Sequence, residues 1–420
     1  MSATIQKQEK STELNDLLIT RNKKNILFTI ILGALSAFGP LSMDMYLPSL
    51  PELTRNLQTT TSFAQLSITA CLIGLALGQI VLGPYSDAHG RRVPLLAGLI
   101  LFTAASLLCA FATSIAWLIP LRFIQGLAGA AGLVLSRAIA RDLYSGPALT
   151  KFFSMLMAIN GIFPILAPIF GGLILRFTNW RGVFIVLMII GACLFLGALL
   201  FVRETLPRNR RIASGLTSSL SAIGTILRDK VFISYAFVQG LIMGAMFCYI
   251  SGSSFVLQDI FHISPQLFSV FFAINGTGIV LMSQLAGFLA GKIDGEKILG
   301  VGVTIAFIGS IGLFSSLFLH SAILLAVLLP LFLIVSMVGL VNTTAFSMAM
   351  QSQGRVAGSA SAILGMGMNL IGAVLSPFVG VLGSGTYLPM AVLILLCDTG
   401  AFFIFILAIQ PKKKEGPERG

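Results

Sequence analysis

Three ionisable side chains stand in or beside long apolar runs of this chain. Asp44 follows ILFTIILGALSAFGPLSM (26–43), Arg122 begins RFIQGLAGAAG, and Asp398 interrupts LLCDTGAFF. A charge at the centre of a bilayer costs at least about 2.5 to 3.5 kcal/mol, so ionisable residues in membrane helices usually mark ion or substrate pathways. A carboxylate binds or releases a proton when its surroundings change. Proton transfer is therefore the chemistry that this pattern predicts.

Asp44 and Arg122 are the two residues whose charges we expect to meet. At 1.5 Å per residue, Asp44 lies about 5 Å inside the outer end of its helix, and Arg122 lies about 12 Å deep in a helix of opposite direction. Long side chains can close that gap, and Pro40, after Gly39, can bend the first helix. The alternative is a wet, interfacial Asp44. For Asp398 the alternatives are proton coupling and a hydrogen bond that packs helices.

These residues need a membrane scaffold, and the composition indicates one. The 420 residues are 56% hydrophobic and 10% charged, whereas soluble domains average about 25% charged. Because a span needs roughly 20 apolar residues, twelve spans can be placed, at about 26–47, 62–84, 93–112, 114–136, 152–175, 182–202, 231–254, 267–290, 298–318, 321–344, 357–382 and 387–409. The sequence predicts an all-α membrane protein without room for a catalytic or ATP-hydrolysing module, and so not an enzyme.

The net charge of +12 is explained by position. Lys and Arg gather in alternate connecting segments, which a cytoplasmic N-terminus places on the inner side of the membrane, as the positive-inside rule requires. We therefore expect both termini in the cytoplasm and no nucleic-acid partner. Because 24 mostly polar residues precede the first span, we expect that span to stay in the mature protein.

Cysteine and histidine give no sign of a metal site, a disulfide or a cofactor. The cysteines lie within apolar spans without paired spacing, as small hydrophobic residues do, at positions Cys71, Cys109, Cys193, Cys248 and Cys397. Three scattered histidines, His89, His262 and His320, offer no zinc cluster.

The chain divides into two similar halves. We expect an N-terminal tail, a six-helix bundle, a central cytoplasmic loop, a second six-helix bundle and a basic tail, at 1–24, 25–202, 203–230, 231–409 and 410–420. In addition, MAINGIFPILAPIFGG (157–172) aligns without gaps with MGMNLIGAVLSPFVGV (366–381). Two pseudo-symmetric bundles imply a substrate site between them near the midplane and alternating access.

The stretch GPYSDAHGRRVPLL after the second span resembles the loop signature of major facilitator superfamily transporters, and the matching residues are Gly83, Asp87, Gly90, Arg91 and Arg92. Gly83 and Gly90 allow a tight turn. The resemblance implies a cytoplasmic gate in which Asp87 meets the N-terminus of the eleventh span, near 356–359, where a negative charge is favoured. The alternative is that the arginines merely anchor the loop at the membrane surface.

Two further stretches resemble motifs of the same superfamily. RFIQGLAGAAG resembles its R-x-x-Q-G motif at Arg122, Gln125 and Gly126. GIFPILAPIFGG resembles its antiporter motif, with Ala167 in place of the usual glycine, and the matching residues are Gly161, Pro168, Gly171 and Gly172. This motif favours proton antiport, and the alternative is a glycine-rich packing helix.

Four stretches, LSMDMYLPSLPEL, GQIVLGPYSD, ARDLYSG and AGSASAILG, together look like the Bcr/CflA-type bacterial drug exporters, over about residues 25–410. The resemblance implies a multi-pass, monomeric transporter of the bacterial inner membrane that exports small drug-like or amphipathic compounds in exchange for protons. It needs no cofactor beyond the proton gradient. The alternatives are a dedicated exporter of a native metabolite, such as a siderophore or sugar, or an importer or sensor on the same scaffold.

Proton coupling is assigned to Asp44, Arg122 and Asp398. Polar side chains in the spans are candidates for the substrate cavity, and they are Tyr46, Gln125, Asn160, Gln239, Asn275 and Asn369. The 32 Phe and 15 Met suit a pliable apolar cavity, because Met adapts its shape to different partners.

Overall fold

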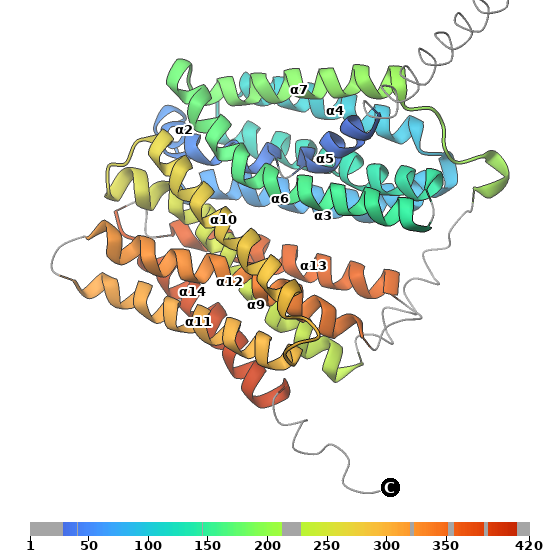
Figure 1. The fold of residues 1–420 in the computed structure, drawn as a ribbon. Helices are drawn as coiled ribbons and strands as arrows, with labels where there is room; N and C mark the ends of the chain where they lie inside the picture. Colours follow the sequence, from blue (N-terminus) through green and yellow to red (C-terminus); the bar gives the residue numbers. More distant parts are fainter. Residues whose placement is uncertain are drawn as a thin grey trace, which may run out of the picture.

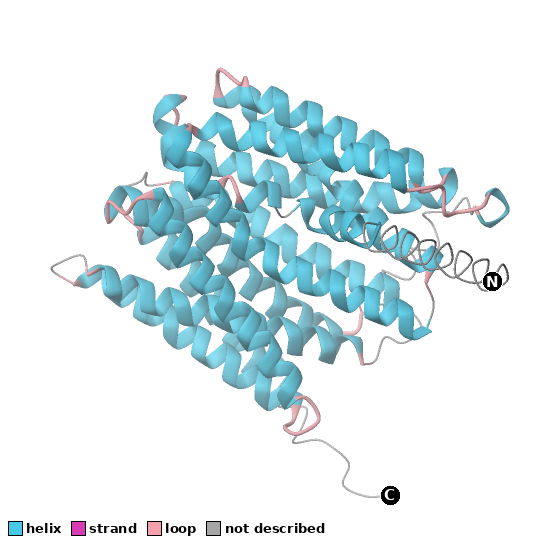
Figure 2. Ribbon diagram, turned by 45° about the horizontal axis from the view of Figure 1, so that its top comes forward, coloured by secondary structure: helices cyan, strands magenta, loops and turns pink. Residues whose placement is uncertain are grey.

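The computed structural model describes residues 28–39, 41–144, 146–211, 228–319, 323–351, 357–381 and 385–409. Within these ranges the chain forms helices joined by short turns, and no strand is present (Figure 2). Among the described residues, ten helices are long and apolar enough to cross a membrane. The bent pair Phe28–Gly39 and Leu41–Asn56 is an eleventh candidate, and α6 (Gly146–Phe177), which contains the shorter apolar helix Ile162–Phe177, lies where the fifth span is expected.

The N-terminal bundle follows the bent pair with α2 (Leu50–Asn56), α3 (Thr61–His89), α4 (Arg92–Ala110), α5 (Ile115–Leu143), α6 (Gly146–Phe177) and α7 (Trp180–Phe201). α5 packs closely against α3 and α4, and α4 packs against α7. The small residues of α5 explain this packing, because a Cβ atom at Gly126 would overlap the carbonyl oxygen of Cys71 in α3. Glycine at this position lets two membrane helices approach closely.

The C-terminal bundle contains α9 (Lys230–Phe255), α10 (Pro265–Leu289), α11 (Gly295–Ser315), α12 (Leu324–Met350), α13 (Ala357–Leu375) and α14 (Leu388–Ile404). α12 packs against α10 and α11, and α9 packs against α13 and α14. Gly339 of α12 lies against the backbone of Ile279 in α10 as Gly126 lies against α3. Equivalent helix pairs in the two halves therefore pack in the same way, with a glycine of one helix against the backbone of the other.

The molecule has two ends, which we name by residues. At the Asn56 end α2 ends and α3 begins, and at the Arg91 end α3 ends and α4 begins. Across the interface α6 packs against α10, and α3 packs against α13 and the 3-10 turn Ser376–Gly380. In Figure 1 the bundles approach each other near α2 and α10 and spread apart toward the opposite end.

The first span is longer than the sequence predicted. Instead of ending near residue 47, it continues through the 3-10 turn Leu47–Ser49 into α2. Pro48 and Pro51 stand at the start of these elements, where a missing backbone N–H costs nothing. Asp44 therefore lies about 18 Å from the end of the helix at Asn56, and not about 5 Å from it.

Candidate functional site

A cavity of about 350 Å³ lies between the bundles, and its size suits a small organic molecule. Met43, Asp44 and Leu72 are among the residues that the N-terminal bundle contributes, and Met243 and Phe247 of α9 lie opposite. Most of the lining is apolar, and the methionines can adapt to ligands of different shape.

Three polar side chains interrupt the apolar lining. Asp44 is 6% exposed and is the one charged residue that lines the cavity among the residues the structure describes. Asn342 of α12 and Asn369 of α13 face it from the other bundle. The Nδ2 of Asn342 donates a hydrogen bond to the sulfur of Met243 (2.9 Å), which leaves its Oδ1 without a partner. The cavity thus offers acceptor oxygens to a ligand that carries hydrogen-bond donors.

Arg122 is fully buried inside the N-terminal bundle and points away from the cavity. Its Nη1 donates hydrogen bonds to the carbonyl oxygen of Ser42 (3.2 Å) and to the side-chain oxygen of Gln125. Its guanidinium carbon lies 4.8 Å from the ring centre of Tyr46 and 5.6 Å from that of Phe184. Cation–π contacts of this kind contribute about 0.5 to 2 kcal/mol, and they help a charge to remain in a dry site.

The expected contact between Asp44 and Arg122 is absent, since no ion pair joins them in the described parts of the chain. The reason is helical periodicity. Ser42 and Tyr46 are four residues apart and share the face that meets Arg122. Asp44 stands between them, about 200° around a helix of 3.6 residues per turn, and so it faces the cavity.

Two predicted cavity residues, Gln125 and Tyr46, instead belong to the group of buried side chains around Arg122, which we call the Arg122 cluster. Gln125 donates a hydrogen bond to Ser106 (2.7 Å), and the hydroxyl groups of Tyr46 and Ser67 share a hydrogen bond (3.1 Å). Both predicted residues are completely buried and do not line the cavity, because their helix faces point into the bundle.

The remaining cavity candidates divide in the same way. Gln239 and Asn275 are buried and do not line the cavity, and Asn275 instead donates a hydrogen bond to Tyr249 (2.8 Å). Asn369 does line it. The side chain of Asn160 lies outside the residues that the structure describes.

Asp398 is enclosed within the C-terminal bundle. It is 0% exposed in α14, beside Ser310 of α11 and Cys248 of α9, and it is not part of the cavity lining. Neither carboxylate oxygen has a hydrogen bond of good geometry within the described residues. Its predicted role in proton coupling stays a prediction.

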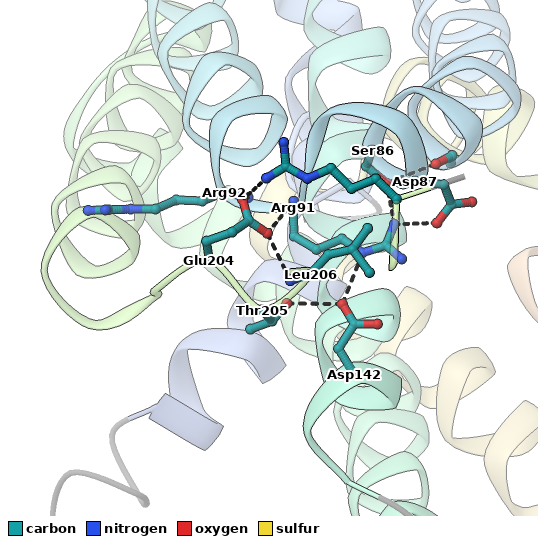
Figure 3. A network of polar contacts seen from close by, with 10 residues as sticks. Ser86, Asp87, Arg91, Arg92, Asp142, Glu204, Thr205 and Leu206 are labelled. Carbon is teal, nitrogen blue, oxygen red and sulfur yellow. Dashed lines mark hydrogen bonds and ion pairs between the residues drawn. The ribbon is translucent and has the colours of Figure 1, made fainter. Parts of the chain in front are cut away.

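A network of charges occupies the Arg91 end (Figure 3). Arg91 is 5% exposed and pairs with Asp87 one turn earlier in the chain (2.6 Å) and with Asp142 at the end of α5 (3.0 Å). Its Nη1 also donates to the hydroxyl of Ser86 (2.7 Å). One buried guanidinium therefore ties the end of α3 to the end of α5.

Glu204 is a part of this network that sequence reasoning missed. Its carboxylate accepts hydrogen bonds from the backbone N–H groups of Arg91 (2.8 Å), Arg92 (3.2 Å) and Leu206 (3.0 Å) (Figure 3). It thus caps the N-terminus of α4, which has no cap from its own N-cap side chain. Partial burial opposes the effect, but these donors and the nearby Arg211 cation lower the pKa of Glu204 below 4.5.

The predicted role of Gly83 in the turn of the loop motif is wrong. Gly83 does not form a turn, because it lies inside α3, and open space surrounds the place of its missing side chain. Gly90 does form the turn, with φ of 98°, and a Cβ atom there would stand 2.5 Å from the Glu204 carboxylate. Asp87 belongs to the last turn of α3. Its latch to 356–359 stays a prediction, since the side chains of that segment lie outside the described residues.

The bundles are joined at the Asn56 end by polar contacts. Arg55 pairs with Asp259 (3.1 Å). Three further side chains donate hydrogen bonds to backbone oxygens of the other bundle, namely Gln65 to Ser251 (3.2 Å), Ser254 to Leu47 (2.7 Å) and Gln258 to Pro48 (3.0 Å). Within the described ranges, the hydrogen bonds between bundles all lie toward this end. The structure is therefore a state closed at the Asn56 end.

The glycines of the predicted antiporter motif pack in this closed end. Gly171 lies against the backbone of Met45, and a Cβ atom at Gly172 would stand 2.5 Å from the hydroxyl of Ser269 in α10. Gln266 donates a hydrogen bond to the carbonyl oxygen of Gly172 (3.0 Å). Pro168 is buried in α6, and the side-chain position of Gly161 is outside the described residues.

A polytopic helical bundle of two halves around a central cavity is typical of membrane transporters, and the family and the relatives of this chain show a transporter and not an enzyme. The chain belongs to the Major Facilitator Superfamily, whose family model matches residues 31–377. This confirms the superfamily that its loop and span motifs resemble.

Relatives of known sequence agree with this assignment. An uncharacterized MFS-type transporter of Bacillus subtilis, YdgK, is 44% identical over 91% of this chain and 96% of its own length. The bicyclomycin resistance protein homolog of Haemophilus influenzae is 28% identical over 89% of this chain and 93% of its own. The multidrug resistance protein MdtL of Salmonella typhi is 27% identical over 63% of this chain and 66% of its own. These relatives are consistent with the Bcr/CflA-type branch.

Solved structures share the fold. A bacterial homolog of the human lysosomal transporter Spinster, in an inward-facing and unoccupied conformation, superposes with a TM-score of 0.74 at 15% identity, over 94% of this chain and 99% of that chain. A D-xylose-proton symporter superposes with a TM-score of 0.69 at 17% identity, over 89% of this chain and 97% of that chain.

Proposed function

We propose that this protein exports small amphipathic compounds across the bacterial inner membrane in exchange for protons. The observation that carries the proposal is the position of Asp44, a carboxylate without a cationic partner among the described residues in a mostly apolar cavity. The names of the bicyclomycin and multidrug resistance relatives support the choice of drug-like compounds.

The chemistry of the cavity narrows the kind of compound. Apolar walls favour an apolar body, and the acceptor oxygens of Asp44 and Asn342 favour amine, amide or hydroxyl donors on it. A sugar, with hydroxyl groups on every side, would leave many of them unpaired against these walls, which is costly. The cavity thus favours drug-like compounds over the alternative sugar cargo.

Coupling follows if proton and substrate use the same carboxylate. A charged Asp44 against apolar walls is unfavourable unless a proton neutralises it or a donor group of the substrate forms a hydrogen bond with it. Binding of one therefore disfavours binding of the other, and such coupling is reciprocal. Arg122 is a positioning residue in this scheme, because it holds the carbonyl of Ser42 two residues before Asp44.

The distribution of charges supports one orientation of the protein in the membrane. Lys and Arg concentrate in the segments of the Arg91 end, and by the positive-inside rule this supports a cytoplasmic position for that end. With the Asn56 end closed, the cavity receives substrate from the cytoplasm. Rocking of the bundles would then open the Asn56 end and let protons from outside displace the substrate.

Inverted membrane vesicles with an acidic interior test the proposal. We expect a neutral apolar amide, which a pH gradient alone does not trap, to accumulate inside them and the accumulation to collapse when a protonophore is added. Accumulation that resists the protonophore would exclude proton coupling. If no member of a panel of apolar amines, amides and alcohols accumulates, the proposed cargo is wrong.

A further inference from the structure

A second cavity lies on the outer face of the C-terminal bundle, at the Arg91 end. It has a volume of about 720 Å³ and lies between the first half of α11 and the π-turn Phe405–Ile409 that follows α14. Its wall on α11 extends from Glu296 to Ile305, which is about 14 Å at 1.5 Å per residue. The proposed transport mechanism does not use this groove.

The groove faces the bilayer. Val301 is 55% exposed in its wall, although α11 is one of the helices apolar enough to span the membrane. Gly300 forms the narrow part, since a Cβ atom there would stand 2.6 Å from the ring of Phe405. The apolar outer face of a spanning helix is covered by acyl chains, so the occupant of the groove must carry an acyl chain or another long apolar chain.

The end of the groove carries one charge of each sign. Glu296 and Lys297 lie side by side in the first turn of α11, and neither forms an ion pair within the described residues. The carboxylate of Glu296 lies next to the hydroxyl of Tyr235 in α9, which fixes its place at the top of the groove. The polar end thus presents a fixed anion beside a cation on a flexible stem.

We propose that this groove binds a phospholipid with a phosphate and a primary amine, of the phosphatidylethanolamine type. Lys297 binds the phosphate, Glu296 accepts hydrogen bonds from the ammonium group, and one acyl chain lies along Val301, Thr304 and Ile305. The height of the charges, at the membrane surface, and the apolar length below them match such a lipid.

Other occupants fit the charges less well. An anionic headgroup without an amine would leave the Glu296 carboxylate facing a negative charge. A quaternary amine cannot donate the hydrogen bonds that a carboxylate accepts. The chain's own segment 410–420 is basic overall, so it would place positive charge beside Lys297.

The test measures lipid retention by the full-length protein, which is independent of transport. The protein is reconstituted in nanodiscs with equal amounts of phosphatidylethanolamine, phosphatidylglycerol and phosphatidylcholine, extracted in mild detergent, and its retained lipids are counted by native mass spectrometry. We expect phosphatidylethanolamine to be enriched several-fold over the other two. Lys297→Gln should reduce the total phospholipid retained by about tenfold, because a charge-assisted hydrogen bond to the phosphate is lost.

Two further variants keep the result interpretable. Glu296→Gln should retain phospholipid but lose the preference for the amine headgroup. Lys292→Gln removes an exposed lysine at the same end that does not line the groove, and it should behave as wild type. Equal total phospholipid retention in wild type and Lys297→Gln, enrichment of phosphatidylglycerol in wild type, or an equal loss in Lys292→Gln would each overturn the proposal.

Discussion

Asp44 and Arg122 are neighbours in space that face opposite ways. Arg122 binds the carbonyl oxygen of Ser42, two residues before Asp44, while the carboxylate of Asp44 lines the cavity between the bundles. The cation is thus held inside one bundle and the carboxylate is left for exchangeable partners. The bend of 49° between Phe28–Gly39 and Leu41–Asn56 lies just before Asp44, so a change in this bend would turn the carboxylate relative to the guanidinium.

Arg122→Lys tests the aromatic part of the cluster. A lysine keeps the charge but lacks the planar guanidinium that stacks on Tyr46 and Phe184. We expect the free energy of unfolding in detergent to fall by about 1 to 2 kcal/mol, as measured by thermal or denaturant unfolding. The same change at the exposed Arg208 serves as control, and an equal effect at both positions would contradict the account.

Gly172→Val should disfavour the state closed at the Asn56 end. The added side chain would meet Ser269 and the carbonyl oxygen of Pro265, and overpacking of this kind costs about 1 to 3 kcal/mol. Spin labels on the two bundles at this end should report longer distances between the bundles than in wild type. Transport by the variant should also be slower. Gly287→Val in α10 is the control, because nothing lies within 4 Å of its Cβ position. Unchanged distances in Gly172→Val would refute this role.

Glu204 gives a pH-dependent prediction. Its pKa is lowered in the folded protein, so its contribution to stability is present above the unfolded-state pKa of about 4.3 and is lost as the pH falls through the folded pKa. Glu204→Gln should lower stability near neutral pH by about 0.5 to 1 kcal/mol, the size of a helix cap. Melting curves should show this difference shrinking as the pH falls below the unfolded-state pKa. A difference that grows on acidification has the wrong sign.

Asp398→Asn distinguishes the role of Asp398 in proton coupling from that of Asp44. Asp398 does not line the cavity, so a substrate cannot reach it in this state. We expect the isosteric amide to retain at least half of the proton-driven export, about a twofold effect or less, which corresponds to roughly 0.4 kcal/mol. Loss of proton dependence in this variant, with export along the substrate gradient preserved, would instead assign coupling to Asp398.

Hydropathy and repeats were sufficient to predict the twelve helices and the two halves. The site was predicted in part. Asp44 and Asn369 reach the cavity, but Tyr46 and Gln125 do not. The depth of a residue along a helix does not determine the rotation of that helix, and the rotation decides which way a side chain points.

Other parts of the site depend on contacts between distant segments. Glu204 caps a helix that begins more than a hundred residues earlier in the chain, and no local pattern predicts that contact. The signal in the sequence was an acidic residue in RETLP, just after a span, beside a basic loop. The apolar run ends near residue 47, but Pro48 and Pro51 begin the helical turns that extend the first span, a position for which proline is well suited.

The most direct test of the account is proton release by the purified protein. In weakly buffered detergent solution, addition of a transported compound should release protons from wild type, and a pH-sensitive dye records them. Asp44→Asn should bind the compound without releasing protons. Asp229→Asn, which keeps a cap at the start of α9, should release them as wild type does. Proton release by Asp44→Asn equal to that of wild type would contradict the central claim that Asp44 carries the exchanged proton.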